Sequence, residues 1–247
     1  MRKNIPAVVL TIAILILWQI VAVVINAAYI LPSPTQIIAK IWELRANLFL
    51  VQLPATMSVT FLGLLISIVF GVGLSVIMDL NKKIADAVYP IIIASQTIPT
   101  TAIAPLFVLW FGYSIWARVL VTILITFFPI TITVYDGFRS TKREMEELLL
   151  TYGAGKKDVF LKLKVPTALP YFFSAIKMAI PLSVIGAAIA EWLGAQSGLG
   201  YFSKRMMTQL DGAAVFAPIV ILSLCAMVSV AIVGIIEDKC VKWRNDI

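Results

Sequence analysis

The chain has 247 residues, of which 61% are hydrophobic and 13% are charged, and its mean hydropathy is +0.98. A water-soluble domain of this length cannot bury that much apolar surface, so the composition indicates an integral membrane protein. Histidine is absent, which excludes a histidine-dependent metal or catalytic site, and the two cysteines show no spacing typical of a disulfide framework.

Six apolar stretches are long enough to cross a bilayer, which takes about 20 residues as a helix. The first follows Arg2 and Lys3 and resembles a signal peptide, but its apolar core is too long and no cleavage site follows, so we expect a retained span. The sequence predicts a single all-α integral membrane domain over residues 1–247. Its six transmembrane helices are expected at residues 6–29, 56–78, 88–111, 118–138, 171–193 and 213–236.

The basic residues outside these spans predict the orientation. With the N-terminus in the cytoplasm, 14 of the 20 lysines and arginines fall on the cytoplasmic side and 5 on the outer side. Both termini are therefore expected in the cytoplasm, in a multi-pass arrangement. The net charge of +7 then reflects topology and contact with anionic membrane lipid, and it gives no reason to expect nucleic acid as a partner.

The largest cytoplasmic loop, residues 139–170, joins the fourth and fifth predicted spans. Its first part predicts a short amphipathic helix that carries Leu148, Leu149 and Tyr152 on one face. Gly153 and Gly155 then permit a tight turn, because glycine accepts the left-handed conformation that ends helices.

The second part of this loop predicts another short helix, beginning at about Lys156, with Val159, Phe160 and Leu163 on one face. We expect Pro166 and Pro170 to end that helix before the fifth span. On the residues alone, the loop is a helical hairpin that lies on the membrane surface.

The spacing within this loop resembles a motif of ABC-importer permeases, the EAA loop, with the pattern E-A-A-x3-G-x9-I-x-L-P. Glu147 and Gly153 occupy the first two fixed positions, and the segment 163–166, Leu-Lys-Val-Pro, occupies the last ones. Leucines replace both alanines, Leu163 replaces isoleucine and Val165 replaces leucine, so the apolar character is kept with larger side chains. The segments ILPSPTQII, TIPTTAIAPLFVLWFG, AEWLGAQSGLGYF and VFAPIVILSL are similar to the nitrate, sulfonate and taurine branch, which includes importers of thiamine's pyrimidine precursors.

This resemblance implies a permease of a bacterial-type cytoplasmic membrane that imports a small polar solute, of the thiamine-precursor pyrimidine, sulfonate/taurine or nitrate class, and the likeness of the outer loop favours the pyrimidine. Its implied partners are a second copy of the permease, cytoplasmic ATPase subunits that bind ATP and Mg, and an extracytoplasmic substrate-binding protein. The coupling residues that it implies are Glu147, Leu148, Leu149, Tyr152, Gly153, Leu163, Val165 and Pro166. In that scheme the three apolar side chains of the first helix enter a groove on the ATPase, Glu147 anchors its rim and Gly153 sets the bend.

The chain itself lacks a P-loop, the G-x-x-x-x-G-K-[ST] motif that cradles phosphates. The nearest segment has Lys157 where Ser or Thr is required and Leu150 where the first Gly would stand. We therefore expect no enzymatic activity and no cofactor in this chain, and ATP hydrolysis by a partner subunit.

Polar residues within the spans are candidates for the translocation path, because each is costly in lipid unless it faces protein or water. In the third span they form two pairs four residues apart around Pro99, which predicts a polar stripe at a kink. The candidates are Gln96, Thr97, Thr100, Thr101 and Glu191. The threonines have the alternative of bonding their own helix carbonyls, and Glu191 either lines an outer gate or lies at interface depth, capped by water.

Small residues recur along the fifth span at every third or fourth position, which predicts close packing against another helix. They are Ala175, Ala179, Ser183, Ala187 and Ala190. The following segment, 194–212, is too polar for a span and fits either a re-entrant turn or a contact with a binding protein.

A second class of function is a self-sufficient secondary transporter or channel, in which the 139–170 loop is only a surface hairpin. Six spans are few for such carriers, and no matched pair of interrupted helices indicates an inverted repeat. The sequence therefore favours the importer subunit, without naming its solute.

Overall fold

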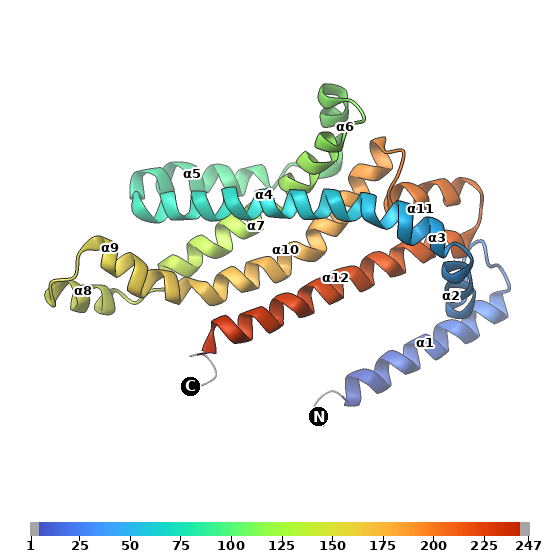
Figure 1. The fold of residues 1–247 in the computed structure, drawn as a ribbon, viewed down its shortest axis with the longest axis horizontal. Coiled ribbons are helices and arrows are strands. Elements are labelled where there is room, and N and C mark those ends of the chain that lie inside the picture. The colour runs from blue at the N-terminus through green and yellow to red at the C-terminus, as the bar shows by residue number, and fades with distance from the viewer. Residues whose placement is uncertain (1–4, 243–247) are drawn as a thin grey trace.

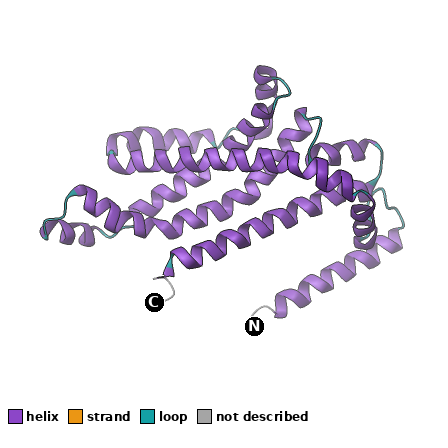
Figure 2. Ribbon diagram, in the orientation of Figure 1, coloured by secondary structure: helices purple, strands orange, loops and turns teal. Residues whose placement is uncertain are grey.

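The computed structural model describes residues 5–242, and the regular elements in that range are all helices (Figure 1). Figure 2 shows the helices joined by short loops, with no strand in the described range. Five helices there are long and apolar enough to cross a membrane. They are α1 (Ile5–Ile25), α4 (Leu53–Leu80), α7 (Ile115–Arg139), α10 (Val165–Gly194) and α12 (Gly212–Cys240). The shorter elements are α2 (Pro34–Glu43), α3 (Arg45–Asn47), α5 (Lys82–Ser95), α6 (Thr100–Phe111), α8 (Arg143–Thr151), α9 (Lys156–Val159) and α11 (Leu199–Thr208), with π-helical turns η2 (Leu48–Gln52) and η3 (Phe160–Lys164).

The centre of the molecule is a layer of three long helices, α4, α7 and α10, that run side by side (Figure 1). Glycines allow them to approach closely, since a Cβ atom on Gly63 of α4 would lie 2.6 Å from Thr122 of α7. A Cβ atom on Gly186 of α10 would lie 3.2 Å from the Cα atom of the same Thr122. Ser67 and Thr126 add a buried hydroxyl contact of 2.7 Å between α4 and α7. These contacts pack the three helices closely into one core.

The small residues of α10 lie in this core, which confirms the packing role predicted for them. Each is at most 2% exposed: Ala175, Ala179, Ser183, Ala187 and Ala190. Small side chains let the backbone of α10 approach α7 along its length.

The N-terminal helix α1 stands apart from this core (Figure 1); it contacts α2, which packs on α12, and its Trp18 ring lies 6.1 Å from that of Phe216 on α12. Ala22 is its single buried residue in the described range. A helix that is apolar all round and exposed in this way must face lipid or another protein chain.

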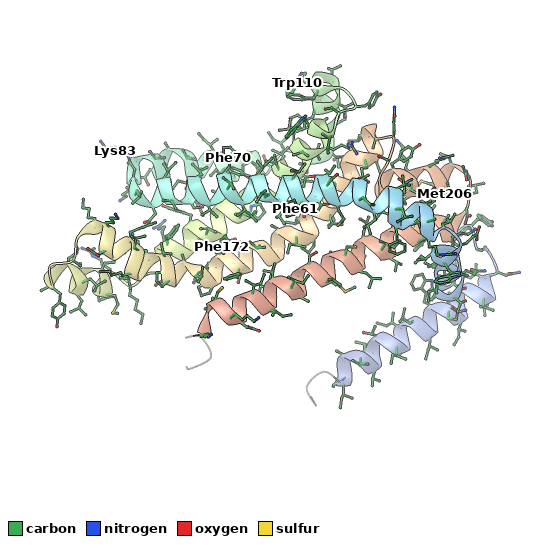
Figure 3. All side chains as sticks on the ribbon, in the orientation of Figure 1. Phe61, Phe70, Lys83, Trp110, Phe172 and Met206 are labelled. Carbon is green, nitrogen blue, oxygen red and sulfur yellow. The ribbon has the colours of Figure 1, made fainter. Side chains whose placement is uncertain are left out.

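The two ends of the bundle differ, and Figure 3 shows Lys83 near one and Met206 near the other. We call the first the hairpin end, because α8 and α9 project there, and the second the opposite end, which holds α2, α3 and α11. At the opposite end Lys40 of α2 contacts Glu43 at 3.0 Å and Asp211, ahead of α12, at 3.3 Å. The hydrogen bond with Glu43 raises the pKa of the Lys40 amine, which favours its charged form.

The third predicted span, 88–111, is wrong as one continuous helix. The structure has two helices, α5 and α6, bent by 95° relative to each other. Pro99 has no backbone N–H to continue the helix and disfavours the helical conformation of the residue before it. The N–H groups of Gln96, Thr97 and Ile98 instead reach back three residues, in tight turns. A break replaces the expected kink.

The expectation that Pro166 and Pro170 end a short helix before the fifth span is also wrong. The helical path runs without a break from Lys156 to Gly194, through both prolines. The π-helical turn η3 ends at Lys164, and the N–H of Val165 bonds to the carbonyl of Phe160, five residues back. This wider turn comes just before Pro166, whose ring would otherwise meet the carbonyl four residues behind it.

Candidate functional site

The hairpin at residues 143–164 begins with α8 and reverses at a left-handed glycine. Gly153 has φ +86°, as the sequence predicted for the turn. The N–H of Gly153 donates to the carbonyl of Leu150, and that of Ala154 donates to Leu149, both at 3.0 Å. These bonds satisfy the last carbonyls of α8, so the turn is fixed by its backbone.

The second limb of the hairpin is anchored in the helical core. Val159 is buried, and the ring of Phe160 lies 5.4 Å from that of Phe138 on α7. Val165 packs against the same core cluster. The motif residues of this limb, Leu163, Val165 and Pro166, are all partly buried. Because the limb is continuous with α10, a force on the hairpin acts directly on that helix.

The first limb presents apolar side chains to the outside. Leu148 is 48% exposed and Tyr152 is 81% exposed, while Leu149 is partly buried. Glu147 is held on the helix surface by Arg143, whose Nε lies 2.8 Å from the Glu147 carboxylate. Exposed apolar side chains clustered on a rigid projection are typical of a docking surface for another protein.

A charged cluster joins the hairpin to the end of α4. Lys164 Nζ lies 3.0 Å from Asp79 of α4 and 3.4 Å from Glu146 of α8. The Asp79 side chain is 6% exposed and that of Lys164 is 19% exposed, so this pair is largely shielded from solvent. The sequence reasoning missed it, since its partners are 85 residues apart.

The four polar candidates around Pro99 do not form a stripe on one helix, which corrects that expectation. Gln96 and Thr97 lie in the break after α5, and Thr100 and Thr101 open α6. Thr97 donates its hydroxyl hydrogen to the carbonyl of Ala94 at 2.7 Å, the alternative considered for the threonines. Gln96, Thr97 and Thr101 are exposed and Thr100 is partly buried, so the break leaves a polar edge on the surface of this chain.

Glu191 lies at the opposite end of the bundle, 1% exposed, against the start of α11. Its carboxylate accepts a 2.8 Å hydrogen bond from the N–H of Gly200. The N–H of Gly198 donates to Gln52 at 2.7 Å, and that of Leu199 donates to Thr56 at 2.8 Å. Three side chains thus cap the free N–H groups at this helix start, where negative charge is also favoured by the helix dipole. We call this cluster the polar cap.

The structure has cavities beside the polar cap and between the long helices. One of about 350 Å³ borders Glu191 and is also lined by Tyr113, Tyr201, Lys204 and Arg205. The other, of about 520 Å³, is a mainly apolar groove between α4, α10 and α12. Its polar side chains are Thr60, Ser183 and Ser229, and its lining within the described residues includes no charged group.

Residues that sequence reasoning missed are those whose partners are distant in the chain. Gln52 and Thr56 are buried polar residues at the start of a long apolar run, and Asp79 stands at its end. Their positions at the ends of a span could have indicated their role in the sequence, because a polar side chain there needs a polar partner. Lys177 likewise finds Glu237 of α12 at 2.6 Å.

A bundle of membrane-spanning helices that holds an anchored hairpin beyond one end defines the membrane subunit of a transporter. The chain belongs to the family described as the binding-protein-dependent transport system inner membrane component, whose model matches residues 67–242. It is therefore a multi-pass permease subunit of an ABC importer, as the EAA-like spacing predicted.

Known proteins agree with this assignment. The chain is 52% identical over 232 residues to the formylaminopyrimidine transport permease protein ThiX of Halalkalibacterium halodurans, covering 94% of this chain and 93% of the relative. It is 28% identical to the putative aliphatic sulfonates transport permease protein SsuC of Bacillus subtilis, covering 97% and 86%. A solved structure titled "Crystal structure of an amino acid ABC transporter with histidines" shares the fold, with a TM-score of 0.62, 16% identity and coverage of 80% and 94%.

Proposed function

We propose that this permease imports a formylated aminopyrimidine, a precursor of thiamine. It does so as a pair of identical chains in the cytoplasmic membrane, with both termini in the cytoplasm. An extracytoplasmic binding protein delivers the solute, and cytoplasmic ATPase subunits, which bind ATP and Mg, dock on the hairpin at residues 143–164.

The observation that carries the coupling part of the proposal is the anchored hairpin. Its first limb exposes Leu148 and Tyr152, and its second limb is fixed to α7 and α10. An ATPase that binds the first limb would therefore move the long helices through the second. Membership of the importer family favours this function over a self-sufficient carrier.

The substrate class is supported by the 52% identical relative, whose name states formylaminopyrimidine transport. The groove of about 520 Å³ agrees with such a solute, because its lining offers hydroxyl groups and apolar walls. A small heteroaromatic ring suits that lining. A sulfonate or nitrate ion would lose its hydration water there and would need a positively charged side chain in its place.

Uptake and co-purification test the two parts separately. The permease, produced together with its ATPase and binding protein, is expected to retain the ATPase in detergent extracts. Vesicles containing the complex are expected to accumulate labelled formylaminopyrimidine in the presence of ATP, without competition from taurine or nitrate. Recovery of the permease without an ATPase would contradict the coupling role, and uptake of a sulfonate in place of the pyrimidine would contradict the substrate.

A further inference from the structure

The cytoplasmic hairpin is covalently continuous with α10, but α4 has no such connection to it. Besides shared apolar packing, α4 contacts the hairpin through the ion pair between Asp79 and Lys164, at 3.0 and 3.2 Å from Lys164 Nζ to the two carboxylate oxygens. Lys164 also pairs with Glu146 of α8 at 3.4 Å, within the hairpin, and two further pairs of the hairpin are local and exposed, such as Lys162 with Asp158 at 2.7 Å within one helical turn. The Asp79–Lys164 pair differs from all of these in joining the hairpin to α4.

The other end of α4 is fixed to the segment between α10 and α11. Gln52, the last residue of the π-helical turn before α4, accepts a hydrogen bond from Gly198, and Thr56 accepts one from Leu199. The helix between these tethers has 28 residues, or about 42 Å at 1.5 Å per residue. Both ends of α4 are thus attached by buried polar contacts to segments that follow far along the chain.

Along its length α4 is locked to α7. Ser75 donates to the carbonyl of Thr131 at 2.7 Å, and Ser67 meets Thr126 at the same distance. At Gly63 the two helices approach so closely that an added Cβ atom would clash with Thr122. A displacement applied at Asp79 would therefore be carried along the helix and not absorbed by side-chain rearrangement.

We propose that the Asp79–Lys164 ion pair is a positioning contact that transmits movement of the hairpin through α4 to the turn at residues 195–200. The proposal rests on the proposed function, because it requires an ATPase that moves the hairpin. The role of the pair is to hold two elements together: Lys164 holds α4 to the second limb of the hairpin. Without this lysine, α4 is linked to that limb only through apolar packing and through α7 and α10. The turn at the opposite end then responds to nucleotide through Gln52 and Thr56.

The test uses the assembled transporter in lipid nanodiscs and a single reporter cysteine. Cys225 and Cys240 are replaced by serine, and Gln196→Cys places an exposed thiol in the turn. Its rate of reaction with a maleimide is measured without nucleotide and with ATP trapped by vanadate. The parent chain is expected to show at least a threefold difference between the two states.

Lys164→Met is expected to reduce this difference to less than 1.5-fold while ATPase recovery and basal ATP hydrolysis stay within twofold. Lys164→Arg, which keeps the charge, is expected to retain most of the difference. Lys162→Met is the matched control. It removes another lysine of the hairpin, and among the acidic groups of the described residues this lysine contacts Asp158 alone. It is expected to behave as the parent. Gln52→Leu, at the far tether, is expected to reproduce the loss.

An undiminished difference in Lys164→Met, or an equal loss in Lys162→Met, would overturn the proposal. Should Lys164→Met fail to fold, the triple variant Asp79→Asn, Glu146→Gln and Lys164→Met removes the charges of both acidic partners of the lysine and carries the same expectation. Failure of the proposed function has a separate signature, since the parent chain itself would then recover no ATPase or show no nucleotide-dependent difference.

Discussion

The carboxylate of Glu191, near the end of α10, accepts a hydrogen bond from the backbone N–H of Gly200 at 2.8 Å, in the first turn of α11. This bond turns an acidic residue in a membrane helix into a cap for another helix. Replacing Glu191 with leucine leaves the buried N–H of Gly200 without its acceptor, and we expect a loss of about 1–3 kcal/mol of stability. Glu191→Gln keeps one carbonyl oxygen in place and should lose less. Thermal unfolding in detergent compares the two, and equal midpoints would contradict a capping role.

The backbone at Gly198 makes a second prediction about the polar cap. Its φ is +123°, and a Cβ atom there would lie 2.2 Å from the carboxyl carbon of Glu191. Gly198→Ala combines backbone strain with overpacking and is expected to cost on the order of 3 kcal/mol or more. Gly73→Ala is the control, since Gly73 is a helical glycine of α4 with open space around its Cβ position. Fluorescence-detected size exclusion after heating should show early loss of the first variant and no loss of the second.

Much of the local structure could be predicted from the sequence, because local signals determine it. Gly153 marked the left-handed turn, and the alanines of α10 marked a packed face. Proline was ambiguous: the break at Pro99 is stronger than the expected kink, whereas Pro166 interrupts nothing. Proline costs a hydrogen bond in either place, and whether the helix continues depends on tertiary contacts around it, such as those of Phe160 with α7.

The candidate site was predictable in part for the same reason. The hairpin follows from short-range patterns, but Glu191 could not be assigned from sequence, since its role depends on α11 folding back over the end of α10. Gln52 and Gly198 are separated by 146 residues, and the periodicity of a sequence does not indicate contacts between residues so far apart. Contacts of this kind require the assembled helices.

Replacement of Leu149 by aspartate tests the docking surface. Leu149 is partly buried beside the exposed Leu148, so a charge there would be desolvated on contact with an ATPase and should weaken association by several kcal/mol, roughly the cost of burying an unpaired charge. We expect at least a tenfold loss of ATPase in pull-downs from detergent extracts, with normal membrane insertion. Leu149→Met keeps the apolar volume and should bind normally. Full ATPase recovery with the aspartate variant would restore the surface-hairpin interpretation.

Gly153 should separate binding from coupling. Valine resists the positive φ of this turn, whereas asparagine tolerates it, and neither side chain meets another atom within 4 Å at the Cβ position. Gly153→Val is therefore expected to re-aim α8 and to keep partial ATPase binding with transport uncoupled from hydrolysis. Gly153→Asn should remain coupled. The measurement is the ratio of solute imported to ATP hydrolysed in proteoliposomes, and equal ratios in both variants would show that the turn does not aim the hairpin.

The orientation in the membrane is tested by labelling single cysteines in intact cells. In the Cys225→Ser, Cys240→Ser background, Lys157→Cys lies on the hairpin and Ser197→Cys lies in the turn at the opposite end. An impermeant maleimide added outside should label the second and not the first. Labelling of both from the same side would contradict the membrane-spanning arrangement of α10 between them.

The π-helical turn at Phe160–Lys164 has a consequence for how such a hairpin changes during evolution. The turn places one additional backbone residue between the hairpin and the membrane helix α10. The side chains before and after it are therefore rotated by about 100° relative to their places in an uninterrupted α-helix, which is the rotation of one helical residue. A single residue inserted into or deleted from the turn is therefore expected to swing α8 around the axis of α10 by about the same angle, while the contacts within the transmembrane core stay as they are.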